Sequence, residues 1–341
     1  MKFAAQRPLR CGIILAGGEG KRVQPFIRRF LGIDLPKQYV NIIGTRSMLE
    51  HTFERAERLI PPERLFVIVA RDHFDYPDAR RQVSNRPPHT VILQPQNKET
   101  GPGLLLPLMH LLKYFPDSIV GVFPSDHFVL QEEHFTACVR RAYEAVEKCP
   151  EKVVFLGVKA TDPEEEYGYI VPEYDDQAPG LPILGVKAFV EKPESTMAAQ
   201  IMSLGGLWNT MIMVFKPETL LHLVRQSSPE LYLFFQQIFK SLDTSRELST
   251  VEKAYKQMKS LNLSKDLLEG LDLHSRNQLS VAPMEGVFWS DWGSKDRILS
   301  VLGSLGYLDR LFKGFSLQVA RDQLRTAANP PTGMQVSASR Q

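Results

Sequence analysis

The sequence has few cysteines, no excess of charge of one sign and no long hydrophobic run. Its three cysteines, Cys11, Cys138 and Cys149, lack CxxC spacing and a matching histidine cluster, which argues against zinc motifs and a disulfide framework and favours reduced structural thiols. The net charge is +2, with 41 basic and 39 acidic residues, so no overall field would draw the chain to nucleic acid or an anionic membrane. Any anionic ligand must be held by local charges.

The chain also lacks a segment that would target or cross a membrane. The apolar run after the basic N-terminal residues is short and ends in glycines rather than at a cleavage site, so we do not expect a signal peptide. The longest later run, 104–115, is interrupted by Pro107, His110 and Lys113 and falls short of the roughly 20 residues of a spanning helix. With the cysteine pattern, these absences predict a cytoplasmic protein.

What the sequence does contain is the alternation typical of an α/β protein. Its 341 residues, 43% of them hydrophobic, are enough to bury a sizeable core. Short β-branched and apolar runs predict strands at 11–16, 64–70, 90–94, 118–123, 152–158 and 278–283, separated by segments of helical periodicity at 46–59, 103–115, 132–148 and most of 229–270. A mostly parallel sheet of this kind places binding loops at the carboxyl ends of its strands.

Beyond about residue 160 the pattern changes to short strands with polar turns, before helices resume near 217. We therefore expect a Rossmann-like mixed, mostly parallel sheet with flanking helices and a hairpin-rich region that forms the second wall of a cleft. The predicted domain spans 8–300, with parts 8–160 and 161–300. Residues 301–341 are expected to form a C-terminal helix and a disordered tail, since the tail is rich in Pro, Gly and Ser.

A glycine-rich loop, LAGGEGKR at 15–22, follows the first predicted strand. Glycines let backbone N–H groups approach phosphates closely, and Lys21 and Arg22 add positive charge. The dehydrogenase fingerprint fails because Val23 stands where a third Gly or Ala is needed. A Walker A loop fails because its first glycine falls on Leu15 and its Ser/Thr on Arg22. Taken alone, the loop is explained equally well by an ordinary tight turn.

An aspartate, Asp126 in FPSDH (123–127), stands at the carboxyl end of a central predicted strand. A carboxylate there is placed to hold Mg²⁺, a hard cation that prefers oxygen ligands. The alternative is that Asp126 caps the helix at 132–148, although the distance to that helix is long. The neighbouring His127 either orients Asp126, contacts substrate, or is a buried hydrogen-bonded imidazole.

Together these features resemble the sugar-phosphate nucleotidyltransferases. LAGGxGxRxxP with a downstream Pro36-Lys37-Gln38 is similar to the signature loop of that family, and PKQ in particular to the mannose-1-phosphate guanylyltransferases. Further motifs follow in the family's order: QPQNKETGP (94–102), FPSDH, YGYI (167–170), VEKP (190–193), WNT (208–210) and WSDWGS (289–294). The resemblance covers about residues 11–300, and it assigns the first part, 8–160, to the nucleotide and the second, 161–300, to the sugar.

The resemblance implies a role for each matching residue. The catalytic residues would be Arg22 at the pentavalent transition state, Lys37 on phosphate, Lys192 on the sugar phosphate, and Asp126 and Asp291 on Mg²⁺. The nucleotide-binding residues would be Leu15, Ala16, Gly17, Gly18, Gly20, Arg22, Lys37, Gln94, Asn97, Thr100 and Ser125. The sugar-phosphate-binding residues would be Gly168, Tyr169, Glu191, Lys192 and Asn209.

Simpler structural roles remain open for several of these residues. Thr100 serves equally well as the N-cap of the helix at 103–115, and Asp291 as the cap of a helix that begins near Lys295. Glu191 and Lys192 could form a solvated surface pair, although Pro193 and the preceding strand favour a site.

The sequence departs from the family pattern at three places. The gap between Pro25 and Pro36 is longer than expected, which affects the conformation of the signature loop. Gly101 replaces the usual alanine of the base segment. Met211 stands where the family usually has glycine after WNT, a change that narrows the pocket or alters which hexose fits.

The predicted reaction transfers a nucleoside monophosphate from a triphosphate to a hexose-1-phosphate, with GTP and mannose-1-phosphate favoured, and releases pyrophosphate to give GDP-mannose. A phosphate monoester is already mostly dianionic at neutral pH, so no general base is needed. Catalysis would come from Mg²⁺, Arg22, Lys37 and Lys192, which position and neutralise two polyanions. The expected partners are these two substrates, without nucleic acid or membrane; the oligomeric state stays open, a homo-oligomer included.

Three alternatives are carried forward. One is a glucose-1-phosphate thymidylyl- or uridylyltransferase. Another is a regulatory paralogue that binds a nucleotide sugar without turnover, which Met211 and the long loop favour but the retained Asp126 and Asp291 do not. A Rossmann dehydrogenase is the weakest, since its fingerprint fails.

Overall fold

The structure, a computed structural model, describes residues 8–174 and 183–307. It divides into two compact units: of the described residues, 8–20, 35–174 and 183–292 belong to the first, and 21–34 and 293–307 belong to the second. The predicted tail beyond residue 307 lies outside the described residues.

The first unit is built on a nine-stranded sheet of order β3-β2-β1-β4-β9-β6-β10-β8-β7, in which β9 also pairs with β7. Strands β1 to β4 are parallel, and β8 and β9 run opposite to the rest. The predicted mixed α/β fold is therefore confirmed. The strands are β1 (Leu9–Ala16), β2 (Leu65–Ala70), β3 (Val91–Gln94), β4 (Ser118–Pro124), β6 (Val153–Lys159), β7 (Gly168–Glu173), β8 (Leu184–Glu191), β9 (Leu207–Phe215) and β10 (Leu279–Pro283).

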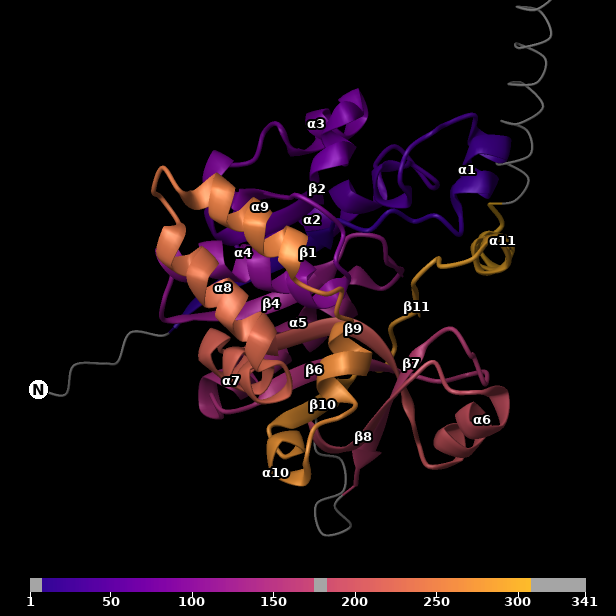
Figure 1. The fold of residues 1–341 in the computed structure, drawn as a ribbon. Helices are drawn as coiled ribbons and strands as arrows, with labels where there is room; N and C mark the ends of the chain where they lie inside the picture. The colour runs from indigo at the N-terminus through magenta and orange to yellow at the C-terminus, as the bar shows by residue number, and fades with distance from the viewer. Residues whose placement is uncertain (1–7, 175–182, 308–341) are drawn as a thin grey trace, which may run out of the picture. The chain divides into compact units, whose positions relative to one another are not determined.

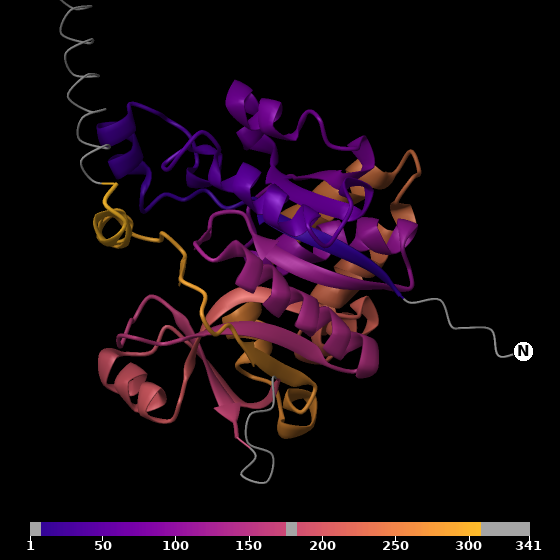
Figure 2. The ribbon, with the colours of Figure 1, turned by 180° about the vertical axis from the view of Figure 1, so that it is seen from behind.

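Helices flank this sheet on both faces (Figures 1 and 2). One face carries α2 (Met48–Glu57) and α5 (Glu132–Lys148); α4 (Thr100–Tyr114) and α7 (Pro217–Ser227) pack on the other, beside α8 (Pro229–Ser241) and α9 (Glu247–Gln257). The periodic apolar residues of α5 are buried, as their spacing predicts, and α5 has the predicted bounds. The shorter helices are α3 (Pro77–Val83), α6 (Ser195–Ser203), α10 (Leu273–Arg276), η1 (Lys37–Tyr39), η2 (Pro62–Arg64), η3 (Arg71–Asp75), η4 (Pro88–Thr90) and the π-helical η5 (Leu263–Leu268).

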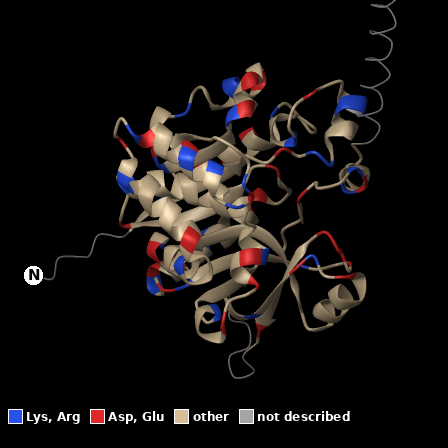
Figure 3. Cartoon of the chain, in the orientation of Figure 1, with Lys and Arg blue, Asp and Glu red and all other residues tan. Residues whose placement is uncertain are grey.

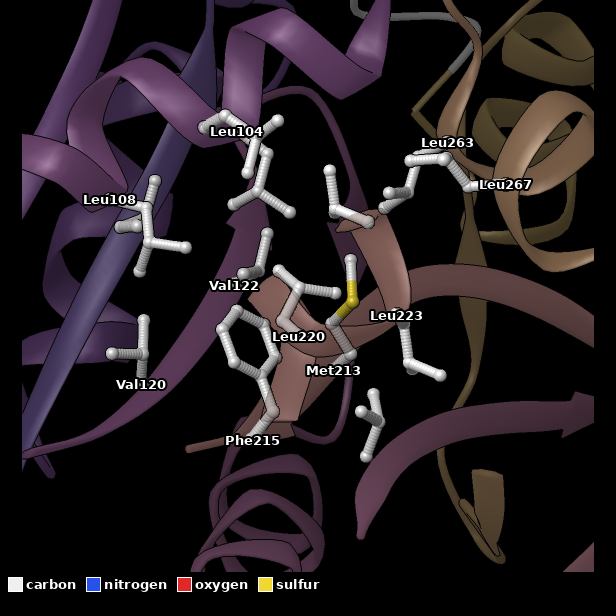
Figure 4. Close-up of a cluster of buried hydrophobic side chains, with 14 of the residues drawn as sticks. Leu104, Leu108, Val120, Val122, Met213, Phe215, Leu220, Leu223, Leu263 and Leu267 are labelled. Carbon is white, nitrogen blue, oxygen red and sulfur yellow. The ribbon is translucent and has the colours of Figure 1, made fainter. Parts of the chain in front are cut away.

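The core on the α4 face joins strands, helices and the π-helical turn. Figure 4 shows Leu104 and Leu108 of α4 facing Val120 and Val122 of β4, with Met213 and Phe215 of β9 beside them. In the same cluster lie Leu220 and Leu223 of α7, and Leu263 and Leu267 of η5. The turn η5 is thus anchored in the core by its leucines, which fixes the residues between them.

A separate two-stranded sheet brings together two distant segments of the first unit. Strand β5 (Phe128–Val129) pairs antiparallel with β11 (Trp289–Ser290), in the register Val129↔Trp289 and Phe128↔Ser290. This pairing places the residues just before β5 next to those just after β11.

The hairpin-rich region predicted beyond residue 160 is present as β7 and β8, which pair antiparallel and continue onto β9. Gly168 lies opposite Glu191 in this hairpin, and Asn209 of β9 lies opposite Gly157 of β6. Helical structure resumes with α7 at Pro217, as expected.

The second unit contains α1 (Gln24–Leu31) and α11 (Lys295–Ser304). Arg28 Nε donates to Asp34 Oδ1 at 2.7 Å, and Ser294 Oγ accepts from Arg297 N as the N-cap of α11. Across all described residues, acidic and basic side chains are interspersed (Figure 3), and no helix is long and apolar enough to cross a membrane.

Candidate active site

The glycine-rich loop after β1 is shaped by contacts that favour glycine. Gly20 has a φ of +62°, and a Cβ there would lie 3.1 Å from the Cβ of Lys37, so a side chain would be strained and crowded. Gln38 donates its Nε2 to the carbonyl oxygens of Ala16, at 2.9 Å, and Gly18, at 2.7 Å. The PKQ motif, whose Lys37 and Gln38 begin η1, therefore holds the loop in place.

Gln94, the last residue of β3, also binds the glycine-rich loop, at Gly17. Its Nε2 donates to the carbonyl oxygen of Gly17 at 3.4 Å, and a Cβ on Gly17 would come within 2.4 Å of that nitrogen. Its Oε1 is buried and has no hydrogen-bond partner among the described residues. A buried acceptor without a donor is costly, so this oxygen suits a ligand that supplies an N–H group.

A cavity of about 140 Å³ opens beside Gln94. Six residues predicted to bind nucleotide line it together: Leu15, Gly17, Gly18, Gln94, Asn97 and Thr100. Ser125, another predicted nucleotide residue, is buried and donates its backbone N–H to Leu15 O at 3.1 Å. The ends of β1 and β3 thus meet around one cavity, at the carboxyl edge where parallel strands place ligands, and Ser125 after β4 is bound to the end of β1.

The ammonium group of Lys37 joins the two predicted metal motifs. Lys37 Nζ lies 2.8 Å from Asp126 Oδ2 and donates to the carbonyl oxygens of Asp291, at 2.6 Å, and Trp292, at 3.2 Å. The lysine side chain is 5% exposed, whereas that of Asp126 is 36% exposed. The lysine predicted to contact phosphate therefore contacts, in this structure, both segments that carry the aspartates.

The side chain of Asp291 is held separately. Tyr167 donates its hydroxyl to Asp291 Oδ1 at 2.9 Å. The pairing of β5 with β11 supplies the backbone framework that brings Asp291 near Asp126. The Lys37 ammonium group thus pairs with the carboxylate of Asp126 and with the backbone of Asp291, and the described residues contain no group of three or more His, Cys, Asp or Glu side chains suited to a metal. Two aspartates on segments joined in this way fit Mg²⁺, which commonly uses one or two carboxylates together with substrate phosphates and water.

His127 is a buried, hydrogen-bonded imidazole that fixes the position of this segment. Trp289 donates its Nε1 to His127 Nδ1 at 3.1 Å, and Arg55 donates to the His127 carbonyl oxygen at 3.0 Å. Burial lowers the pKa of His127 to about 4, so the ring is neutral at pH 7 and its Nδ1 accepts.

The simpler capping roles are wrong for three residues. The N-cap of α5 is Gln131 rather than Asp126, and the N-cap of α11 is Ser294 rather than Asp291. Thr100 is the first residue of α4, after the N-cap Glu99. Its hydroxyl oxygen instead accepts a hydrogen bond from the backbone N–H of Leu263, at 2.8 Å.

Three of the predicted sugar-phosphate residues meet on one face of the hairpin. A Cβ on Gly168 would lie 2.5 Å from Glu191 Oε2 and 3.5 Å from the Cβ of Asn209. The absence of a side chain at Gly168 therefore leaves this face open in front of a carboxylate and an amide. Burial raises the pKa of Glu191 despite the opposing charge of Lys192, whose Nζ lies 3.7 Å from Glu191 Oε1.

The other two predicted residues lie differently. Lys192 is 54% exposed and its backbone N–H donates to Tyr167 O at 3.1 Å. Tyr169 is fully buried, and its hydroxyl donates to the carbonyl oxygens of Asp162 and Glu164. Because side chains alternate along a strand, the Tyr169 ring lies on the face opposite Gly168, and the structure does not bring it to Glu191 and Asn209.

Several residues in or next to the site motifs have strained backbone conformations. Among the described residues, non-glycine φ values in the left-handed region occur at Glu99 (68°), Lys192 (50°), Met211 (57°) and Trp292 (48°), as well as at Asp243. Each costs about 1–3 kcal/mol and tends to persist where function requires it. Met211 takes the backbone conformation that suits the glycine usual in the family, which explains how this departure is accommodated and why it is strained.

Sequence reasoning missed two contributors. Tyr167 was part of a recognised motif but had no assigned role, although its hydroxyl binds Asp291. The π-helical turn η5 belongs to no motif, yet its Ser264 contacts Asn209, and the charges of its Lys265 and of Glu269, the residue after the turn, act on the pKa of Glu191. π-Helical turns are rare and often occur at functional sites, but local sequence carries little signal for them.

Arg22 belongs to the second unit, with residues 21–34. Its predicted role at the transition state stays a prediction. The positive charge that Lys21 was expected to add to the loop also stays a prediction, and the lengthened segment between Pro25 and Pro36 contains most of α1 and the residues that follow it.

The sequence model of the family described as nucleotidyl transferase matches residues 11–305. A solved structure titled mannose-1-phosphate geranyltransferase, from Thermus thermophilus, superposes with a TM-score of 0.71 at 26% identity and covers 85% of this chain and 79% of that one.

Two curated relatives are similar in sequence. The xanthan biosynthesis protein XanB of Xanthomonas campestris is 27% identical over 291 residues, 85% of this chain and 58% of its own length. The mannose-1-phosphate guanylyltransferase RfbM of Salmonella typhimurium is 27% identical over 285 residues, 83% of this chain and 56% of its own length. The chain thus spans a little over half the length of these relatives.

Substitution of Glu191 tests whether burial raises the pKa of this carboxylate on the face that it forms with Gly168 and Asn209. Between the ordinary pKa of 4.5 and the raised folded-state pKa, the folded chain binds more protons than the unfolded chain, so the free energy of unfolding falls as pH rises. Glutamine does not ionise, so the stability of Glu191→Gln relative to wild type should increase between pH 4 and pH 8, as measured by urea unfolding. Glu173→Gln, at an exposed position of β7, is the matched control. If the difference in unfolding free energy between Glu191→Gln and wild type stayed constant over this range, the raised pKa of Glu191 would be contradicted.

Proposed function

The chain belongs to the nucleotidyl transferase family, as its motifs predicted, and on that premise we propose that it transfers a nucleoside monophosphate from a triphosphate to a hexose-1-phosphate. We favour GTP and mannose-1-phosphate as substrates, with GDP-mannose and pyrophosphate as products. The observation that carries the proposal is the convergence of Asp126 and Asp291 on Lys37, beside a cavity lined by a glycine-rich loop.

The nucleotide would lie in the cavity between the ends of β1 and β3. Gly17 and Gly18 allow the backbone to approach phosphates, and the buried Oε1 of Gln94 would receive an N–H donor from the base. Guanine has such donors on its Watson–Crick edge. This acceptor is compatible with GTP, and the preference for guanine over other bases with N–H donors comes from the PKQ resemblance and the relatives' names.

Asp126 and Asp291 would hold Mg²⁺. When bound, the cation neutralises charge on the triphosphate and helps to orient it. Lys37 keeps the two carboxylate-bearing segments together and adds a positive charge next to them. Tyr167 orients the Asp291 carboxylate through its hydroxyl group. Because these groups are fixed before substrates arrive, little reorganisation is required at the moment of reaction.

The sugar phosphate would lie against Gly168, Glu191 and Asn209, with its phosphate near the exposed ammonium group of Lys192. A phosphate oxygen then attacks the α-phosphorus, and pyrophosphate leaves in line. The nucleophile is already ionised near neutral pH, so no side chain has to remove a proton. The paired charges and hydrogen-bond donors of the site are what such a reaction needs, since its chemistry is electrostatic.

The direct test of the function is pyrophosphate release over a matrix of four nucleoside triphosphates and several hexose-1-phosphates, with and without Mg²⁺. We expect the highest kcat/KM for GTP with mannose-1-phosphate, and no release without the cation. Silence in every combination, while a nucleotide sugar still binds by calorimetry, would favour the non-catalytic paralogue that Met211 suggested. The highest rate with glucose-1-phosphate and dTTP or UTP would contradict the substrate assignment alone.

Removal of one carboxylate tests the metal site. Asp126→Ala should lower kcat by roughly 10²-fold or more, since interactions aimed at transition-state charge have effects of this size. The variant should also lose some stability, because Asp126 is the carboxylate partner of the buried Lys37 ammonium group, so kcat is measured at a temperature where circular dichroism shows the variant to be folded. Asp117→Ala, at an exposed position before the other end of β4, is the matched control and should keep wild-type activity. Full activity of Asp126→Ala would remove this residue from the site.

A further inference from the structure

Asn209, a residue of the proposed sugar site, forms a ring of hydrogen bonds with Met211 and Ser264. Met211 donates its backbone N–H to Asn209 Oδ1 at 2.9 Å. Asn209 donates its Nδ2 to Ser264 Oγ at 3.2 Å, and Ser264 donates its hydroxyl to Met211 Sδ at 3.1 Å. Asn209 Nδ2 also lies 3.6 Å from that sulfur, within hydrogen-bond distance for a thioether.

The ring fixes which way the Asn209 amide points. A backbone N–H can only donate, so the atom facing Met211 N must be the carbonyl oxygen Oδ1. The two hydrogens of Nδ2 are then directed at Ser264 Oγ and Met211 Sδ. The capacity that remains on this amide is the second lone pair of Oδ1, which accepts and cannot donate.

The ring is also held rigidly. Ser264 is 2% exposed and lies in η5, between leucines that pack in the core (Figure 4). The backbone N–H of Leu263 is bound to the Thr100 hydroxyl, which ties the turn to the start of α4. Met211 is held in a left-handed backbone conformation with a φ of 57°. Rotation of the amide would break at least two of these hydrogen bonds.

We propose that Ser264 and Met211 are positioning residues that make Asn209 a hydrogen-bond acceptor toward the sugar. This inference rests on the proposed function. Glu191 Oε2 lies on the same face, at Gly168, and a carboxylate also accepts. A Cβ on Gly168 would lie 2.5 Å from Glu191 Oε2 and 3.5 Å from the Asn209 Cβ, so both accepting side chains belong to the face that Gly168 leaves open, and that face would select a sugar for hydroxyl groups that donate.

Deoxy and deoxyfluoro hexose-1-phosphates test this directly, because fluorine replaces a hydroxyl without its ability to donate. Each ring position of the best hexose-1-phosphate is examined in turn. At the position that contacts Asn209, replacement by hydrogen or by fluorine should raise the sugar-phosphate KM of the wild type equally, by about fivefold, the equivalent of about 1 kcal/mol for one hydrogen bond. The KM for the nucleoside triphosphate should not change.

Variants of the ring should change this pattern. Ser264→Ala removes the acceptor that holds one N–H of Asn209, so the amide is free to rotate and to turn its Nδ2 toward the sugar, and the fluorinated analogue should then have a lower KM than the deoxy analogue. Met211→Leu keeps the side-chain volume but removes the sulfur acceptor, and should act in the same direction even if Ser264→Ala fails to fold. Ser227→Ala is the matched control, because Ser227 donates to Leu267 O of the same turn without touching Asn209, and it should retain the wild-type pattern.

The outcomes separate the two proposals. If the wild type turns over its hexose-1-phosphate but the fluorinated analogue outperforms the deoxy analogue at every position, Asn209 donates and the inference is overturned. An identical analogue pattern in wild type, Ser264→Ala and Met211→Leu would also overturn it. Absence of turnover with every parent hexose-1-phosphate would instead contradict the proposed function itself.

Discussion

The ammonium group of Lys37 is the interaction on which the site depends. A buried lysine is tolerated only when its charge is paired and its donors are satisfied, and here one carboxylate and two carbonyl oxygens meet both requirements. These partners come from segments far apart in the chain, after β4 and after β11. The lysine thus links the glycine-rich loop with both aspartate motifs, since Gly20 packs so closely against Lys37 that a Cβ on Gly20 would be crowded.

From this centre, hydrogen bonds extend to the rest of the site. Tyr167 connects the Asp291 carboxylate to the backbone of Lys192, at the edge of the face proposed for the sugar. On the other side, Thr100, beside the cavity proposed for the nucleotide, is bound to η5, and Ser264 of that turn is bound to Asn209. The cavity, the aspartates and this face are therefore parts of one connected structure. This arrangement suits a reaction whose main difficulty is to hold two polyanions in line.

Much of the fold could be predicted because it follows from local pattern. The apolar residues of α5 recur at helical spacing, and the first strands are β-branched runs. These patterns extend over several residues, and the structure buries the apolar residues that they contain. The returning strand β10 and the hairpin of β7 and β8 were also predicted within a few residues. Motif order then indicated which residues should meet, and Gly168, Glu191 and Asn209 do meet.

What the sequence could not reveal depends on contacts between distant residues. The capping roles considered for Thr100, Asp126 and Asp291 were reasonable from spacing, and only the actual helix starts excluded them. The partnership of Ser264 with Asn209 joins residues 55 positions apart, and the turn that carries Ser264 has no periodicity to reveal it. Likewise, a lysine expected on phosphate gave no local sign that it would pair with a carboxylate of the metal motif.

The measurement that tests this account most directly is the position of a divalent cation in crystals grown with Mn²⁺ and a nucleotide sugar, located by its anomalous scattering. We expect one peak within about 2.0–2.6 Å of carboxylate oxygens of both Asp126 and Asp291, distances typical of hard cations. Lys37 should remain in contact with the backbone of Asp291. A well-occupied peak bound by neither aspartate, next to an ordered nucleotide sugar, would contradict the assignment of these residues as the metal site.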